Sequence, residues 1–155
     1  MTDTLTQAKL GHPHISEAEW RLMRVVWTQP GITSRQLIDT LSASTDWKVG
    51  TIKSLLSRLI QKGYLDKAQD TSPFQFHATI SQEEAALGRL QAALEPICTK
   101  SRARYLAHLL ATNPLSQADC QALIDQLQEQ IKSAPQAVAC QCPPGACQCH
   151  NHHIS

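Results

Sequence analysis

The stretch KVGTIKSLLSRLIQKGYLDK at residues 48–67 decides the expected fold. Between residues 48 and 62 the apolar side chains recur every three or four positions, which places them on one face of a helix. These apolar residues are Ile52, Leu55, Leu56, Leu59 and Ile60. The opposite face carries hydroxyls and long cations, and Gly63 is expected to end the helix. The pattern therefore predicts an amphipathic helix with a polar, basic outer face.

The residues after Gly63 predict a short antiparallel hairpin, because residues 64–67 and 74–80 flank the turn sequence DTSP. Two helices are expected before the amphipathic one. The first has the capping-box pair Ser16 and Glu19, and the second begins at Thr33 or Ser34 and runs to about Leu41. Three helices followed by a hairpin are typical of a winged helix-turn-helix.

The second half of the chain predicts further helices. Another capping box at Ser81 opens a helix whose apolar stripe is Leu87, Leu90, Leu94 and Ile97, with a kink expected at Pro96. Two more helices follow, separated by Asn113-Pro114. Their apolar residues are the candidate dimer contacts: Leu106, Leu109, Leu110, Leu123, Ile124 and Leu127. The same stripes are equally compatible with a core inside one chain.

The fold class expected is mainly α with a small β-hairpin: a winged helix-turn-helix, then a helical dimerisation domain and a Cys-rich tail. The predicted boundaries are an N-terminal arm at 1–14, a DNA-binding domain at 15–80, a dimerisation domain at 81–133, and a linker with a metal-binding tail at 134–155. No signal-like start or apolar run of membrane-spanning length is present, so the protein is expected in the cytoplasm.

The positive charge of the chain is concentrated in one stretch. The whole chain has a net charge of +1, but residues 48–67 carry five cations and one acid, and 5 − 1 gives +4. These five cations are expected to contact about five phosphates of double-stranded DNA per protomer. The predicted DNA-binding residues are Arg35, Lys48, Thr51, Lys53, Ser54, Ser57, Arg58 and Lys67. Any surface helix shows polar residues outward, so the hairpin and the local charge carry this prediction.

The last sixteen residues contain four of the six cysteines, as two Cys-x-Cys pairs around a Pro-Pro-Gly turn. In an extended segment, residues two apart project to the same side, and the turn can bring the pairs together. The predicted metal ligands are Cys140, Cys142, Cys147 and Cys149. Soft thiolates select Cu(I), Zn(II) or iron-sulfur clusters. The alternative is a disordered tail whose cysteines pair by oxidation, which a reducing cytosol disfavours.

Other metal-binding side chains are interpreted more conservatively. His150, His152 and His153 are optional ligands, because Cu(I) prefers thiolates. Cys98 and Cys120 are interpreted as small buried hydrophobes and left outside the site. No hydrolytic motif is present, so an enzyme is not expected and no catalytic residue is assigned.

These motifs resemble a known family. The stretches ISEAEWRLMRVVW and GTIKSLLSRLIQKGYL, with Asp46-Trp47, are similar to the penicillinase-repressor (BlaI/MecI) winged-helix proteins. Within that family, the arrangement Cys-x-Cys-x-x-x-x-Cys-x-Cys resembles the tail of the CopY-type copper-responsive repressors. Antibiotic-responsive members are cleaved at an Asn-Phe bond, and this chain contains no Asn-Phe dipeptide.

The resemblance implies a homodimeric repressor of a copper-export operon. It implies zinc in the tail of the DNA-bound form, and release of operator DNA when Cu(I) replaces that zinc. A copper chaperone is a further expected partner, as the donor of Cu(I). Competing hypotheses are a repressor with a purely structural zinc tail and another inducer, a copper carrier or buffer, and a redox sensor using tail disulfides.

Overall fold

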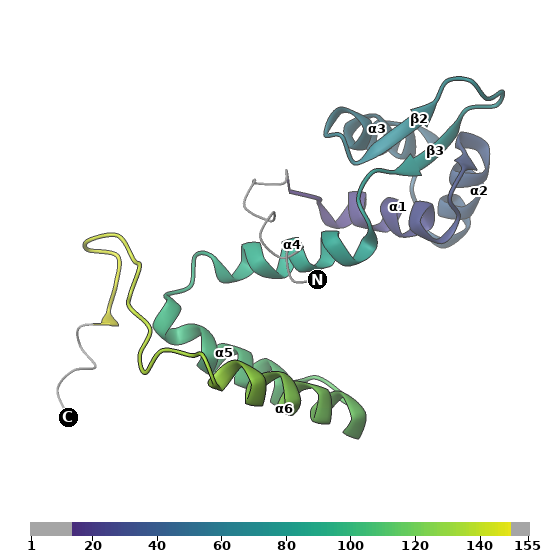
Figure 1. The fold of residues 1–155 in the computed structure, drawn as a ribbon. Coiled ribbons are helices and arrows are strands. Elements are labelled where there is room, and N and C mark those ends of the chain that lie inside the picture. The colour runs from purple at the N-terminus through teal and green to yellow at the C-terminus, as the bar shows by residue number, and fades with distance from the viewer. Residues whose placement is uncertain (1–13, 150–155) are drawn as a thin grey trace. The chain divides into compact units, whose positions relative to one another are not determined.

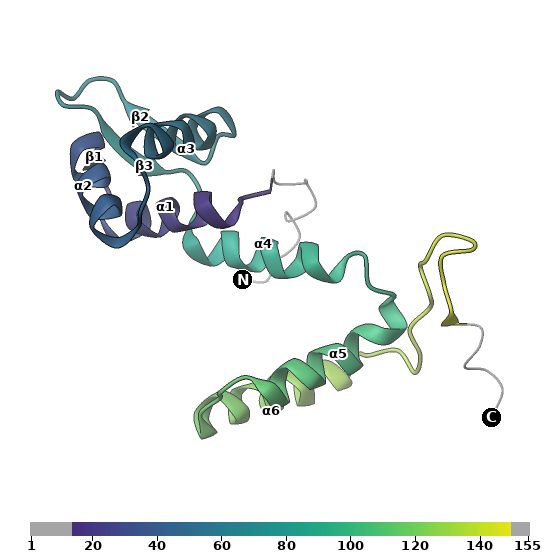
Figure 2. The same cartoon turned by 180° about the vertical axis from the view of Figure 1, so that it is seen from behind.

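The computed structural model describes residues 14–149 (Figures 1 and 2). The predicted N-terminal arm, apart from His14, and the three tail histidines lie outside the described residues. The chain divides into two compact units, the first ending at Leu90 and the second beginning at Gln91. No helix in the described part is long and apolar enough to cross a membrane.

The first unit is a winged helix, as predicted. Its elements, in chain order, are α1 (Glu17–Thr28), β1 (Ile32–Thr33), α2 (Ser34–Ser44), α3 (Val49–Gln61), β2 (Leu65–Ala68) and β3 (Gln75–Ala78). The strands form one antiparallel sheet in the order β1-β3-β2, with Ile32 opposite Phe76. Strand β1 was not predicted, because two residues are too short to show the period-two pattern of a strand.

Local hydrogen bonds set the helix starts. The Ser16 side chain accepts from the backbone of Glu19, and the Glu19 side chain accepts from the backbone of Ser16. Thr33 and Gln36 form the same reciprocal pair at α2. These boxes satisfy backbone donors that the first helical turn leaves free. The predicted capping boxes at Ser16 and Ser81 are confirmed.

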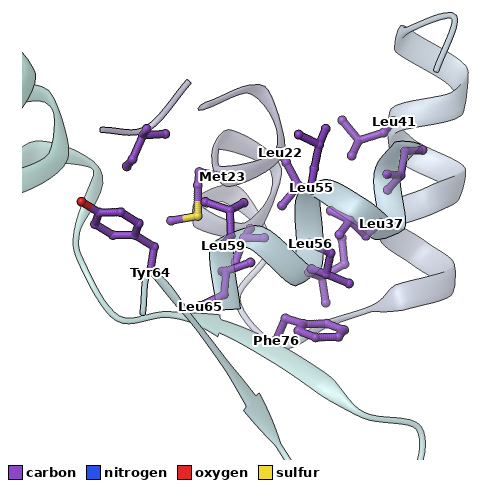
Figure 3. Close-up of a cluster of buried hydrophobic side chains, with 14 of the residues drawn as sticks. Leu22, Met23, Leu37, Leu41, Leu55, Leu56, Leu59, Tyr64, Leu65 and Phe76 are labelled. Carbon is purple, nitrogen blue, oxygen red and sulfur yellow. The ribbon is translucent and has the colours of Figure 1, made fainter. Parts of the chain in front are cut away.

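The core of this unit lies between the three helices and the sheet (Figure 3). Its most deeply buried side chains are Leu22, Met23, Val26, Leu37, Leu41, Ile52, Leu59 and Leu65. Helix α3 therefore turns its aliphatic stripe inward, which leaves its polar face in solvent. Ile60, predicted on that stripe, is 37% exposed, because at 3.6 residues per turn it lies at the edge of the stripe, about 80° around the helix from Ile52.

The three tryptophans, Trp20, Trp27 and Trp47, pack against this core. Trp20 and Trp27 meet edge to face with ring centroids 5.2 Å apart. The Trp27 indole Nε1 donates to the Ile80 carbonyl at 2.9 Å, which ties α1 to the end of the wing.

Helix α4 (Gln82–Leu94) follows the wing, and α5 (Thr99–Thr112) and α6 (Gln117–Ile131) belong to the second unit. The expected kink at Pro96 is wrong: α4 ends at Leu94, before the proline. Proline clashes with the carbonyl four residues earlier and disfavours a helical conformation of the preceding residue. Helices α5 and α6 contain no buried residue, so their leucines have no core within one chain.

Candidate DNA-binding surface and thiol cluster

Helix α3 lies beside the wing strands (Figure 1), and its polar side chains are exposed. All eight predicted DNA-binding residues are exposed. Five lie on α3, whose N-cap residue is Lys48, while Arg35 lies in the first turn of α2 and Lys67 on β2. A helix that carries short hydroxyls and cations outward can enter the major groove and reach base edges and phosphates.

Lys62 belongs to the basic stretch, but its side chain forms an ion pair within the winged helix. Its Nζ donates to both carboxylate oxygens of Glu19, at 2.9 and 2.7 Å, and to the His14 carbonyl at 2.9 Å. The Glu19 side chain is only 3% exposed, and removing the partner of a buried charge is costly. Lys62 is therefore engaged within the fold, and contacts of the other four cations with phosphate stay a prediction. Sequence spacing gave no signal for this pair, which is 43 residues apart.

Lys67 also has a partner on the wing. Its Nζ lies 3.7 Å from the centroid of the exposed Phe74 ring, across the turn between β2 and β3. Such a cation–π contact at an exposed site contributes about 0.5–1 kcal/mol. The contact holds the charge on the wing without burying it, so Lys67 stays available to a phosphate.

In the second unit, four cysteine sulfurs converge. The Sγ atoms of Cys98, Cys140, Cys147 and Cys149 all lie within 4.8 Å of one another. The Cys98 Sγ is 2.9 Å from that of Cys149 and 3.6 Å from that of Cys140, and the Cys140 and Cys147 sulfurs are 3.1 Å apart. All four side chains are half-buried free cysteines.

This group differs from the predicted ligand set by one member. It contains three of the predicted tail cysteines, and Cys98 takes the fourth position. Cys142 lies beside the group, since its backbone N–H donates to the Cys140 sulfur at 3.5 Å. The interpretation of Cys98 and Cys120 as buried hydrophobes is wrong: Cys98 is half-buried among thiols, and Cys120 is exposed on α6, outside the cluster. Cys98 is 42 residues from Cys140, so no spacing motif indicated it.

Backbone geometry assembles the cluster. The Ala146 N–H donates to the Pro143 carbonyl at 3.1 Å, which closes the predicted Pro-Pro-Gly turn. Gly145 has φ +80°, a left-handed conformation that a side chain disfavours. The turn brings Cys140 and Cys147 together, and Cys98 is the N-cap residue of α5.

Hydrogen bonds among the thiols lower the pKa of two cysteines and raise the pKa of two others. The pKa of Cys98 is lowered, first by the Cys149 thiol and also by the backbone N–H of Lys100. Interactions with Cys149 and Cys140 likewise lower the pKa of Cys147. The thiols of Cys140 and Cys98 raise the pKa of Cys142 to about 12, and Cys147 and Cys98 raise that of Cys149. Because metal ligands must be thiolates, metal binding here releases protons and weakens as the pH falls.

The sulfur group fits a soft metal ion. Tetrahedral zinc with Zn–S bonds of about 2.3 Å places its sulfurs about 3.8 Å apart. The sulfur separations of 2.9 to 3.6 Å, with none above 4.8 Å, require only small shifts to reach that arrangement. Cu(I) takes the same ligands. The cluster can therefore bind a metal ion, and the donor set narrows the choice to thiophilic metals.

Comparison with known proteins identifies the family. The model of the penicillinase repressor family matches residues 15–129, most of the chain. The chain belongs to the penicillinase repressor family. The family is one of transcriptional repressors.

Individual relatives agree with this membership. An uncharacterised 16.5 kDa protein from Latilactobacillus sakei is 37% identical over 135 residues, covering 87% of this chain and 92% of the relative. The methicillin resistance regulatory protein MecI of Mammaliicoccus sciuri is 30% identical over 70 residues, covering 45% of this chain and 57% of MecI. The solution structure of monomeric Bacillus licheniformis BlaI with the blaP half-operator is 32% identical. It covers 48% of this chain and 90% of that one, with a TM-score of 0.44.

Proposed function

We propose that this repressor responds to copper: its zinc-bound form binds the operator of a copper-export operon, and replacement of zinc by Cu(I) at the cysteines releases the DNA. The observation that carries the proposal is the convergence of cysteine sulfurs within 4.8 Å in a chain of a repressor family. The protein would act in the cytoplasm, where thiols stay reduced, with a copper chaperone as the donor of Cu(I).

The exposed face of α3 supports DNA recognition by this helix. One recognition helix reads only a few base pairs, so useful specificity needs two half-sites held by a dimer. Exposed leucines on α5 and α6 support a homodimer, because a single chain leaves them in solvent. The proposed contacts are Leu106, Leu109, Leu110, Leu123, Ile124 and Leu127, with exposed fractions between 36% and 60%.

The proposed response to copper depends on exchange of the metal ion bound by the thiolates. Exchange of Zn(II) for Cu(I) at thiolates changes no oxidation state, so the switch needs no oxidant or reductant. A ligand shifts an equilibrium only by its differential affinity for the two states, so Cu(I) must bind the DNA-free form more tightly than the DNA-bound form. A coupling of about 1 to 3 kcal/mol changes operator affinity by roughly 5- to 150-fold, which is sufficient for a switch.

A titration of the zinc-loaded protein on its own promoter tests this proposal. Fluorescence anisotropy under anaerobic, reducing conditions should show operator affinity falling by roughly 5- to 150-fold as Cu(I) is added, with zinc appearing in solution. Unchanged operator binding with Cu(I) bound would mean that the zinc tail is structural and the inducer is another molecule. Metal transfer without any operator binding would indicate a copper carrier.

Changing Arg58 to alanine tests the proposed recognition face. Arg58 is exposed in the last turn of α3, so its loss should weaken operator binding without affecting the core. If Arg58 contacts a phosphate, the slope of log affinity against log salt should decrease by about 1. The matched control is Lys132→Ala, which removes an exposed cation beyond the end of α6. Equal salt slopes for R58A and the unchanged protein would remove Arg58 from the interface.

A further inference from the structure

Cys98 brings the helical unit into contact with the cysteine-rich tail. It lies between the end of α4 and the first residue of α5, whereas the other sulfurs of the cluster lie beyond residue 139. Its sulfur is 2.9 Å from that of Cys149 and 3.6 Å from that of Cys140. A sulfur at these distances from two others is placed to share a metal ion with them.

The segment that carries Cys98 is held in place. The Arg102 Nε donates to the Ile97 carbonyl at 3.0 Å, and the Ser101 N–H donates to the Cys98 carbonyl at 2.8 Å. These bonds fix the residue at the start of α5, where its sulfur faces the tail. A ligand on a rigid element holds its position better than one on a loop.

A second contact joins the same two segments. The Thr99 hydroxyl donates to the Ala139 carbonyl at 2.6 Å, immediately before Cys140. The start of α5 therefore meets the start of the tail through a hydrogen bond as well as through sulfur. The position also favours an anion, because the N-terminus of a helix stabilises a thiolate.

We propose that Cys98 is a ligand of the bound metal, together with Cys140, Cys147 and Cys149, and that it ties the tail to the start of α5. This inference rests on the proposed function and deepens it. A metal held by tail cysteines alone leaves the tail free of the helical unit. Ligation by Cys98 instead makes the metal a bridge between the tail and α5, so that exchanging the metal acts directly on the helical unit.

The test measures zinc affinity of the full chain by competition with a chelator of known affinity. Serine is a good N-cap residue, so Cys98→Ser preserves the start of α5. Loss of a residue that hydrogen-bonds to a metal ligand costs about 10- to 100-fold in metal affinity. Loss of a direct ligand should therefore cost at least about tenfold. Cys120→Ser is the matched control, since Cys120 is exposed on α6 outside the cluster. The C120S protein should bind zinc with unchanged affinity. Unchanged zinc affinity in C98S would overturn the inference.

Comparison with Cys142→Ser sharpens the result. A site made only of the two Cys-x-Cys pairs predicts a loss of affinity in C142S and none in C98S. The cluster described here instead predicts a loss in C98S, because Cys98 is one of the four converging sulfurs, whereas the Cys142 thiol lies at the edge of that group. A loss in both variants still makes Cys98 a ligand.

Alkylation of the unchanged protein gives a readout that does not depend on any variant. With zinc bound, Cys98 should be protected from iodoacetamide as strongly as Cys140, while Cys120 reacts freely, as measured by mass spectrometry. Alkylation of Cys98 at the same rate with and without zinc, beside protected tail thiols, would overturn the inference and leave the proposed function standing. If zinc protects Cys98 but Cu(I) does not release the protein from DNA, the inference about Cys98 stands and the proposed copper response is wrong.

Discussion

A chain with both Cys140 and Cys147 changed to serine stays on its operator when Cu(I) is added. The two sulfurs are 3.1 Å apart and come from different Cys-x-Cys pairs, so their loss removes half of the converging group. The unchanged protein should lose roughly 5- to 150-fold in operator affinity under the same titration, and the variant should show no change. Anisotropy with and without Cu(I) measures the ratio within each protein, so a different starting affinity does not affect the comparison.

Cys120→Ser is the control for this result. It also removes a thiol from the second unit, but one that is exposed on α6 and outside the cluster. We expect C120S to be released by Cu(I) like the unchanged protein. Normal copper-induced release of the double variant would refute the assignment of these cysteines as the copper sensor.

The variant Leu109→Glu together with Leu127→Glu should be monomeric. These side chains are 52% and 60% exposed in one chain, so glutamate at either site does not disturb a core within that chain. In a dimer interface, however, the two substitutions would place unpaired charges in an apolar contact. Joining two binding modules raises the overall affinity by about 10²- to 10⁴-fold, so loss of the dimer should weaken binding to a full operator by about 100-fold or more.

Sedimentation of the free protein and titration against full and half operators measure these effects. Gln128→Glu supplies the control, because it adds a negative charge at an exposed position of α6 without removing an apolar side chain. That variant should remain dimeric. A double leucine variant that sediments as a dimer would exclude this face of α5 and α6 as the interface.

Sequence periodicity was sufficient for features that depend on near neighbours. The stripe of Ile52, Leu55 and Leu59 predicted both the buried and the exposed face of α3, since residues three and four apart share one side of a helix. Capping boxes gave the start of α1 for a similar reason, because the residues involved are three apart. The winged-helix fold class followed from these local signals, and the structure confirms it.

Features that join distant segments appeared only in the tertiary structure. Strand β1 exists because β3 supplies its partner, and Lys62 is held by Glu19, which is 43 residues away. Cys98 meets the tail in the same way, across 42 residues.

By itself, the sequence determined the amphipathic helices, the wing and the presence of a thiol-rich tail, because each depends on residues close together along the chain. Only the tertiary structure decided which thiols converge, and it brought Cys98 among them while leaving Cys142 beside the group. The physical reason is that a metal-binding cluster requires atoms to be close in space, and that closeness is set by how α5 and the tail turn are packed.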